Sequence, residues 1–248
     1  MHILIKFIIR NFSKKMNSIN NILGQKFSYL SIDFEGLDFQ EQILKQITLE
    51  ALKNIHEKFN LKESNTKEII DLIENDKIND IELELGFKFP HKNKSDHWHL
   101  TTFFKSKQRT ELSEESRKAL MEFEKNKIIP VRVLSFIYIP DKILILLCNP
   151  DCSVQNKYAH ITLLVKNVNP YFSNVVLENI FENEDYLKKD YEAMISSLSK
   201  DDMDVIDENS NYAKHCVLNN LDYIEEDCYV YFFDKKKFTL NGKMKYNF

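Results

Sequence analysis

Glycine and proline are scarce in this chain, with 4 glycines and 5 prolines among 248 residues. So few glycines leave no glycine-rich loop to cradle a phosphate, and no low-complexity tract is present. No apolar run approaches the ~20 residues that cross a bilayer, so no membrane partner is expected. The 43% of hydrophobic and 12% of aromatic residues are enough for a sizeable core in one large domain or two small ones.

Paired cysteine motifs are also missing. Cys148, Cys152, Cys216 and Cys228 form no Cys-x-x-Cys pair, and the Cys148-x3-Cys152 spacing lacks the second half of a zinc site. We therefore expect reduced, mostly buried thiols, with no metal and no other cofactor. Reduced thiols are typical of proteins inside the cell, which favours a cytoplasmic location.

Acidic residues are absent from the first 32 positions, which hold five basic side chains. The whole chain has a formal net charge of −4, which leaves −9 for residues 33–248. An acidic body argues against an extended nucleic-acid track, because such binding needs many phosphate-neutralising cations. A local pocket for one RNA end or nucleotide, on a monomer, remains compatible with this charge. Residues 1–25 are interpreted as a basic N-terminal extension or, alternatively, a mitochondrial presequence.

Hydrophobic periodicity predicts strands and helices in mixed order within a single domain, residues 26–248. An acidic exposed loop is expected at residues 200–211. Helices are expected at about 39–59, 66–74, 113–125, 173–182 and 186–198, and strands at about 27–34, 81–89, 96–104, 130–139, 143–148, 157–165, 227–233 and 237–247. Hairpins in place of regular βαβ repeats favour an α+β fold with antiparallel sheets and flanking helices.

The pattern His-x-Thr occurs twice, at residues 99–101 and 160–162, each time in a run rich in β-branched and aromatic residues. Residues two apart in a strand share a face, so His99 shares a face with Thr101, and His160 with Thr162. The residues between them then point into a core. Two such strands, side by side, direct two imidazoles and two hydroxyls into one central groove between two lobes.

Two histidines in one groove suit the hydrolysis of a phosphodiester without a metal. One imidazole deprotonates water as general base, and the other protonates the leaving ribose oxygen as general acid. The threonine hydroxyls can donate hydrogen bonds to the non-bridging phosphate oxygens. The sequence does not say whether His99 or His160 is the base.

Residues around the two motifs are candidates for contacts with the substrate. Phe103 lies on the predicted His99 face and Tyr158 on the predicted His160 face, so either can stack on a nucleobase, as can Tyr171. His97 is interpreted as a rim residue of the groove. The alternative for His97 is a metal site shared with His99, since His-x-His is also a ligand spacing in sheets.

The paired motif resembles the signature of the two-histidine phosphoesterase superfamily. This superfamily includes the 2′-5′ RNA ligase-like proteins and the cyclic phosphodiesterase domain of fungal and plant tRNA ligases. The opening strand at residues 29–32 is also similar, and Pro170, Ser173 and Asn174 resemble a Pro-x-x-Ser-Asn helix start of its RNA-repair branch. The resemblance implies a bilobal fold and metal-independent hydrolysis of 2′,3′-cyclic or 2′-5′ phosphates at the ends of RNA or on nucleotides, with His99, Thr101, His160 and Thr162 as catalytic residues.

Two other functions remain open from the sequence. The same fold can serve as a catalytically inactive module that binds a nucleotide or an RNA end, or as a subunit of an assembly. The other is a metal-dependent site built on His97 and His99, which needs a further ligand that the sequence does not select.

Overall fold

A computed structural model describes residues 19–34, 38–61, 65–78, 80–90, 98–105, 111–198, 213–221, 224–233 and 238–247. The expected acidic loop at 200–211 and most of the basic extension lie outside these ranges. The helices are α2 (Asp38–Phe59), α3 (Thr66–Glu74), α4 (Asp80–Leu85), α5 (Glu114–Glu122), α6 (Phe172–Asn183) and α7 (Asp185–Leu198). The strands are β1 (Tyr29–Asp33), β2 (His99–Phe104), β3 (Ile128–Ile139), β4 (Ile143–Pro150), β5 (His160–Val165), β6 (Ala213–Leu221), β7 (Ile224–Phe232) and β8 (Thr239–Asn247).

The described strands form one sheet in the order β4-β5-β2-β1-β8-β3-β7-β6, and every pairing is antiparallel. A further pairing of β3 with β4 closes the first six strands of this order into a ring. Strand β3 makes the closure possible because its first half pairs with β8, its second half pairs with β7, and its other edge pairs with β4. The predicted α+β class with antiparallel pairing is confirmed, and the sheet is continuous across both halves of the chain.

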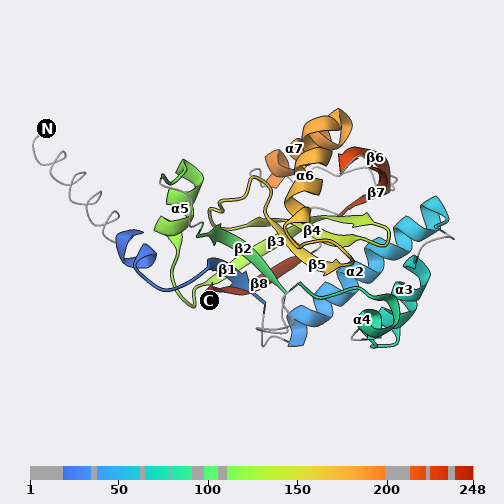
Figure 1. Ribbon diagram of the computed structural model, residues 1–248, viewed down its shortest axis with the longest axis horizontal. Helices are drawn as coiled ribbons and strands as arrows, with labels where there is room; N and C mark the ends of the chain where they lie inside the picture. Colours follow the sequence, from blue (N-terminus) through green and yellow to red (C-terminus); the bar gives the residue numbers. More distant parts are fainter. Residues whose placement is uncertain are drawn as a thin grey trace, which may run out of the picture.

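Two hydrophobic cores lie on opposite faces of the central strands. Alternate residues of β3 divide between them, so that Phe136 and Tyr138 join the core under α2 and α3, whereas Ile137 and Ile139 join the core under α6 and α7. Figure 1 shows α6 and α7 on one side of the strands and α2, α3 and α4 on the other. Burial on both faces explains why the second half of β3 and the first six residues of β4 are almost entirely apolar in sequence.

Both strands that carry the His-x-Thr motif have an irregular register directly after the threonine. On β2, Thr101 pairs with Ser31 and Phe103 pairs with Leu30, so Thr102 is the additional residue. On β5, Thr162 pairs with Ile145 of β4 and Leu164 pairs with Leu144, so Leu163 is the additional residue. A β-bulge of this kind inserts one unpaired residue and reverses the alternation of faces beyond it. Both motif strands therefore have a β-bulge directly after the threonine of the motif.

The strand predicted at residues 81–89 is wrong. The chain forms the short helix α4 there, with Ile81 buried and Leu83 83% exposed, and only Lys88 makes an isolated antiparallel bridge, to Val165. Leucine and glutamate alternate in this segment, and both are strong helix formers, while glutamate is depleted in strands. Helix propensity and acidic residues at the first turn, where the helix dipole favours them, outweigh the alternation.

The described part of the chain contains neither a candidate membrane span nor a candidate metal cluster. None of its helices is long and apolar enough to cross a bilayer. Within the same residue ranges, no group of three or more His, Cys, Asp or Glu side chains is placed to hold a metal ion.

Candidate active site

The two motifs lie side by side because β2 and β5 are antiparallel neighbours. Leu100 and Ile161, the central residues of the two motifs, are register partners, and both are fully buried. In an antiparallel pair the flanking residues then also oppose each other, which places His99 across from Thr162 and His160 across from Thr101. The expected juxtaposition of two imidazoles and two hydroxyls is therefore present in the structure.

All four motif side chains line one cavity of about 1240 Å³. Its walls come from β1, β2, β5, the loop between β4 and β5, the start of α6 and the residues just before α5. Besides the motif residues, the lining comprises Tyr29, Phe104, Glu111, Leu112, Ser113, Gln155, Asn156, Lys157, Asn169, Pro170, Tyr171, Ser173, Asn174 and Glu178. This cavity is named the His-Thr groove below.

His160 is held by polar partners at both ring nitrogens. Its Nδ1 lies 2.8 Å from the main-chain oxygen of Tyr158, and its Nε2 lies 2.8 Å from the hydroxyl oxygen of Ser173. A carbonyl oxygen only accepts hydrogen bonds, so Nδ1 carries a proton in every charge state of this ring. In the neutral imidazole the lone pair is therefore on Nε2.

Burial favours the neutral form of His160. The side chain is only 8% exposed, and loss of hydration lowers the pKa of His160 below its ordinary value of 6.5, although the hydrogen bond to the Tyr158 carbonyl opposes this. Near neutral pH the ring is therefore uncharged, with Nε2 able to accept a proton.

His99 has different surroundings. It is half-buried, its ring stacks on Tyr29 with 5.1 Å between ring centroids, and its register partner on β1 is Asp33. Opposed residues of an antiparallel pair point to the same face, so the Asp33 carboxylate lies on the His99 side of the sheet. Burial, followed by the nearby Asp33 charge, raises the pKa of Tyr29 above its ordinary value, which keeps its hydroxyl protonated.

Phe103, expected on the His99 face, is not in the groove. The bulge at Thr102 reverses the alternation, so Phe103 is 2% exposed in the core against Phe27, and Phe104 lines the groove in its place, 55% exposed. Sequence alternation missed Phe104 because it assumed a regular strand.

Tyr158, expected beside His160, is also not in the groove. It is buried against Phe181 and Tyr191 in the core under α6 and α7. Strand β5 begins only at His160, so strand alternation does not extend back to Tyr158. Its contribution to the site is its carbonyl oxygen.

Tyr171 is placed as expected, on the rim of the groove and 69% exposed. His97, the other rim candidate, lies outside the described residues. Ser173 and Asn174 stand at the helix start as expected, and the side chain that accepts from the preceding turn is that of Asn169, which is bonded to the Tyr171 amide at 2.9 Å. Ser173 lies within the first turn of α6, against His160.

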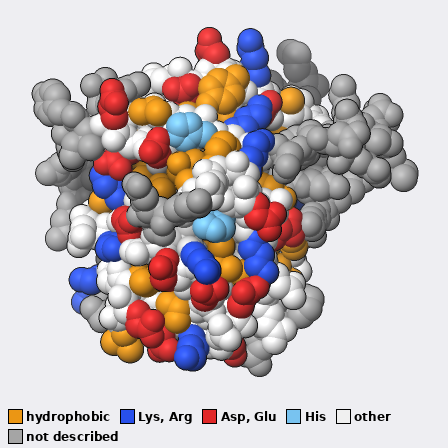
Figure 2. All heavy atoms as spheres, turned by 90° about the vertical axis from the view of Figure 1, so that its right-hand side faces the viewer, with side chains coloured by type: hydrophobic (Ala, Val, Ile, Leu, Met, Phe, Trp, Pro, Cys, Tyr) orange, Lys and Arg blue, Asp and Glu red, His pale blue; other side chains and the backbone are white. Residues whose placement is uncertain are grey.

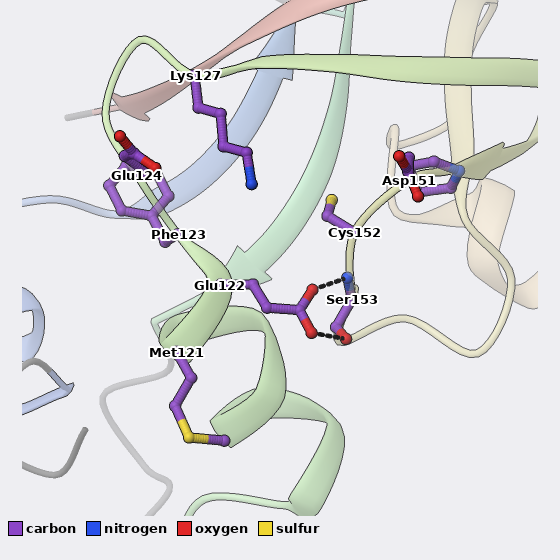
Figure 3. Close-up of a pocket in the computed structure, with 9 residues that line it drawn as sticks. Met121, Glu122, Phe123, Glu124, Lys127, Asp151, Cys152 and Ser153 are labelled. Atoms are coloured by element: carbon purple, nitrogen blue, oxygen red, sulfur yellow. Dashed lines mark hydrogen bonds between the residues drawn. The ribbon is translucent and has the colours of Figure 1, made fainter. Parts of the chain in front are cut away.

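The loop between β4 and β5 is fastened to the motif strand β2. The amide of Gln155 donates to the Thr102 carbonyl at 2.7 Å, and the Gln155 side-chain oxygen accepts from the Phe104 amide, also at 2.7 Å. Two residues earlier in the loop, the amide and the hydroxyl of Ser153 both donate to the Glu122 carboxylate at the end of α5, at 2.6 and 2.9 Å (Figure 3). These bonds hold one wall of the His-Thr groove.

Charges of both signs surround the groove. Lys157 forms an ion pair with Glu182, while Glu111 and Glu178 are further members of the lining. On the face of the molecule in Figure 2, acidic and basic side chains are intermixed, and no uniformly basic stretch is visible.

Comparisons with known proteins leave the family open. No family model matches the chain, and no curated protein matches it. A solved structure described as "Crystal Structure of Fungal RNA Kinase" matches at 14% identity with a TM-score of 0.43, covering 91% of this chain and 46% of that one. The chain thus spans less than half the length of that protein, and a likeness of this degree supports no conclusion about activity.

Proposed function

We propose that the chain is a metal-independent phosphodiesterase that acts on a 2′,3′-cyclic phosphate or a 2′-5′ linked end of RNA or of a nucleotide. The observation that carries the proposal is the His-Thr groove, in which two imidazoles and two hydroxyls from paired strands line one cavity. The closed sheet is then a two-lobed arrangement with a pseudo-two-fold axis between Leu100 and Ile161. The matching bulges after the two motifs support this equivalence.

The surroundings of the two histidines suggest how they divide the work. His160, buried and with its lone pair on Nε2, is the general base that takes a proton from water. His99, whose register partner on β1 is Asp33, is the general acid that protonates the leaving ribose oxygen, because a carboxylate on the same face favours an imidazolium. Asp33 also lies 3.6 Å from the Lys245 ammonium, so it serves both cations. Thr101 and Thr162 hold the non-bridging oxygens of the phosphate.

Two exposed aromatic side chains extend the proposal to the nucleobase. Phe104 and Tyr171 both line the groove and are more than half exposed, although burial of such large apolar surfaces is otherwise favourable. Each presents a ring on which a base can stack, an interaction worth about 1–3 kcal/mol per base.

A second function, binding without turnover, is favoured by one observation. Both nitrogens of the His160 ring already have protein partners, and the ring is nearly buried. A groove of this kind can hold a phosphate against the hydroxyls and His99 without activating water. The binder then retains affinity for a cyclic nucleotide and releases no product.

The experiment that separates the two functions follows the hydrolysis of a 2′,3′-cyclic nucleotide in the presence of EDTA. We expect turnover by the wild-type chain, and a loss of roughly 10²–10⁴-fold in kcat for both His99→Ala and His160→Ala, which is the usual contribution of a positioned acid or base. His56→Ala, which changes a histidine of α2 outside the groove, is the control. Full activity in the His160→Ala protein contradicts the paired mechanism, and binding without product supports the second function.

A further inference from the structure

Ser173 has one hydroxyl proton and two acceptors for it. Its Oγ lies 2.8 Å from Nε2 of His160 and 2.8 Å from the main-chain oxygen of Pro170. The side chain is 1% exposed, so water does not replace either partner. At any moment the hydroxyl donates to only one of the two atoms.

The charge of His160 decides which of the two bonds forms. When the imidazole is neutral, Nε2 has a lone pair and accepts from the Ser173 hydroxyl. When the imidazole is protonated, Nε2 becomes a donor, so Ser173 Oγ accepts from it and turns its own proton to the Pro170 carbonyl. Both charge states of a nearly buried ring are therefore fully hydrogen-bonded.

We propose that Ser173 relays a proton from water to His160 and stabilises the imidazolium that forms. This inference rests on the proposed function, in which His160 is the base. A hydrogen bond from a charged donor is roughly twice as strong as a neutral one, so the pair favours the protonated ring over the neutral ring. Ser173 thereby lowers the cost of placing a charge in a buried position.

The proton transfers of the step balance. The Ser173 hydroxyl passes its proton to Nε2 of His160, whose one lone pair faces it, and takes up a proton from a water in the groove. The resulting hydroxide forms a bond to phosphorus. The bond between phosphorus and the leaving ribose oxygen breaks, and that oxygen takes the proton of His99. The protonated Nε2 then donates to Ser173 Oγ, and the proton that Ser173 took from water is donated to the Pro170 carbonyl.

Other ionisable groups line the same groove and are left unchanged in the variants below. Among the described residues that line the cavity they are Tyr29 of β1, His99 of β2, Glu111 before α5, Lys157 of the loop before β5, and Glu178 of α6. Tyr158, next along that loop, contacts the ring through its main-chain oxygen. A change in the titration of His160 on removal of the Ser173 hydroxyl is therefore assigned to that hydroxyl.

The test compares Ser173→Ala with Ser197→Ala. Ser197 is a matched control, because its hydroxyl donates to the carbonyl three residues earlier in a helix, Met194, at 2.7 Å, and contacts no histidine. The pKa of His160 is measured by NMR titration of its ring nitrogens, which also identifies the nitrogen that carries the proton in the neutral ring. kcat and KM for a 2′,3′-cyclic nucleotide are measured on the same samples.

In Ser173→Ala we expect the pKa of His160 to fall below its wild-type value, because the bond to the charged ring is lost. We expect kcat to fall about 10-fold or more with little change in KM, as for loss of a hydrogen bond to a charged group. Ser197→Ala matches the wild type in all three quantities. An unchanged or raised pKa in Ser173→Ala overturns the inference.

The wild-type spectrum and the combination of pKa and turnover distinguish the possible outcomes. If Ser173→Ala does not fold, the wild-type spectrum still decides, since a neutral His160 with its proton on Nε2 contradicts the bonding described. If the chain hydrolyses no cyclic nucleotide but the pKa of His160 falls in Ser173→Ala, the proposed function fails while the hydrogen-bonded pair stands. If turnover is normal and the pKa is unmoved, only the role of Ser173 fails.

Discussion

His99 and His160 have the same three-residue motif but unlike surroundings. His160 is nearly buried between a carbonyl and a hydroxyl, whereas His99 is half-buried, stacked on Tyr29 and opposite Asp33. Catalysis by an acid and a base needs such a difference, because two identical imidazoles have no reason to hold opposite protonation states at one pH. Under the proposed function, the residues around each motif determine whether its ring acts as the acid or the base.

The pH dependence of turnover follows from the burial of His160. The base acts in its neutral form, and its pKa is lowered from 6.5 by loss of hydration. As the pH falls, the acidic limb of kcat/KM should therefore have its midpoint below pH 6.5, where the ring takes up its proton. A pH profile of kcat/KM with a 2′,3′-cyclic nucleotide measures this. An acidic limb at or above pH 6.5 contradicts the assignment of His160 as the base.

Among the secondary-structure elements, the bulges set which side chains reach the groove. Alternation correctly predicted that His99 and Thr101 share a face, because both precede the additional residue on β2. Alternation failed for Phe103, one residue beyond Thr102, since no residue type in a run of β-branched and aromatic residues indicates the position of a β-bulge. The contact of Ser173 with His160 joins α6 to β5 across 13 residues, so the local pattern indicated only a helix start.

The loop between β4 and β5 is an element whose anchorage can be tested apart from the chemistry. Glu122 accepts two hydrogen bonds from Ser153 and lies outside the His-Thr groove (Figure 3). In Glu122→Ala we expect kcat/KM for a cyclic nucleotide to fall a few-fold, the effect of losing about 1 kcal/mol of loop stabilisation. Glu114→Ala removes an exposed carboxylate of the same helix, paired with Lys118, and is the control. Equal values for both variants mean that the Glu122 contact does not position the groove.

For the whole molecule, the composition and the order of strands and helices were sufficient to predict an α+β fold with antiparallel pairing. The closure of the sheet was not predictable, because β3 changes its partner from β8 to β7 partway along its length and periodicity contains no sign of this. The segment at residues 81–89 shows the opposite failure, where a clean alternation formed a helix. The closure depends on pairing between strands far apart in the sequence, whereas the segment at residues 81–89 depends on local helix propensity, which periodicity alone does not include.

The stability of the closed sheet depends on the join between its two halves. Leu100 is fully buried where β2 meets β5. Leu100→Ala should lower the free energy of unfolding by about 2–5 kcal/mol, since it removes buried methyl groups and leaves a cavity. Leu83→Ala, at a position that is 83% exposed, should change it by less than about 0.5 kcal/mol. Denaturant unfolding of both proteins measures the difference, and similar values would show that this join contributes little.

If His99 and His160 act on a single phosphate, as proposed, a double-mutant cycle should reveal their coupling. The turnover of a 2′,3′-cyclic nucleotide is measured for His99→Ala, His160→Ala and the protein with both substitutions. Residues that act as a unit are strongly non-additive, so the double variant should be about as slow as the slower single variant. Losses that multiply, or a single variant with wild-type turnover, would show that the two histidines do not act together.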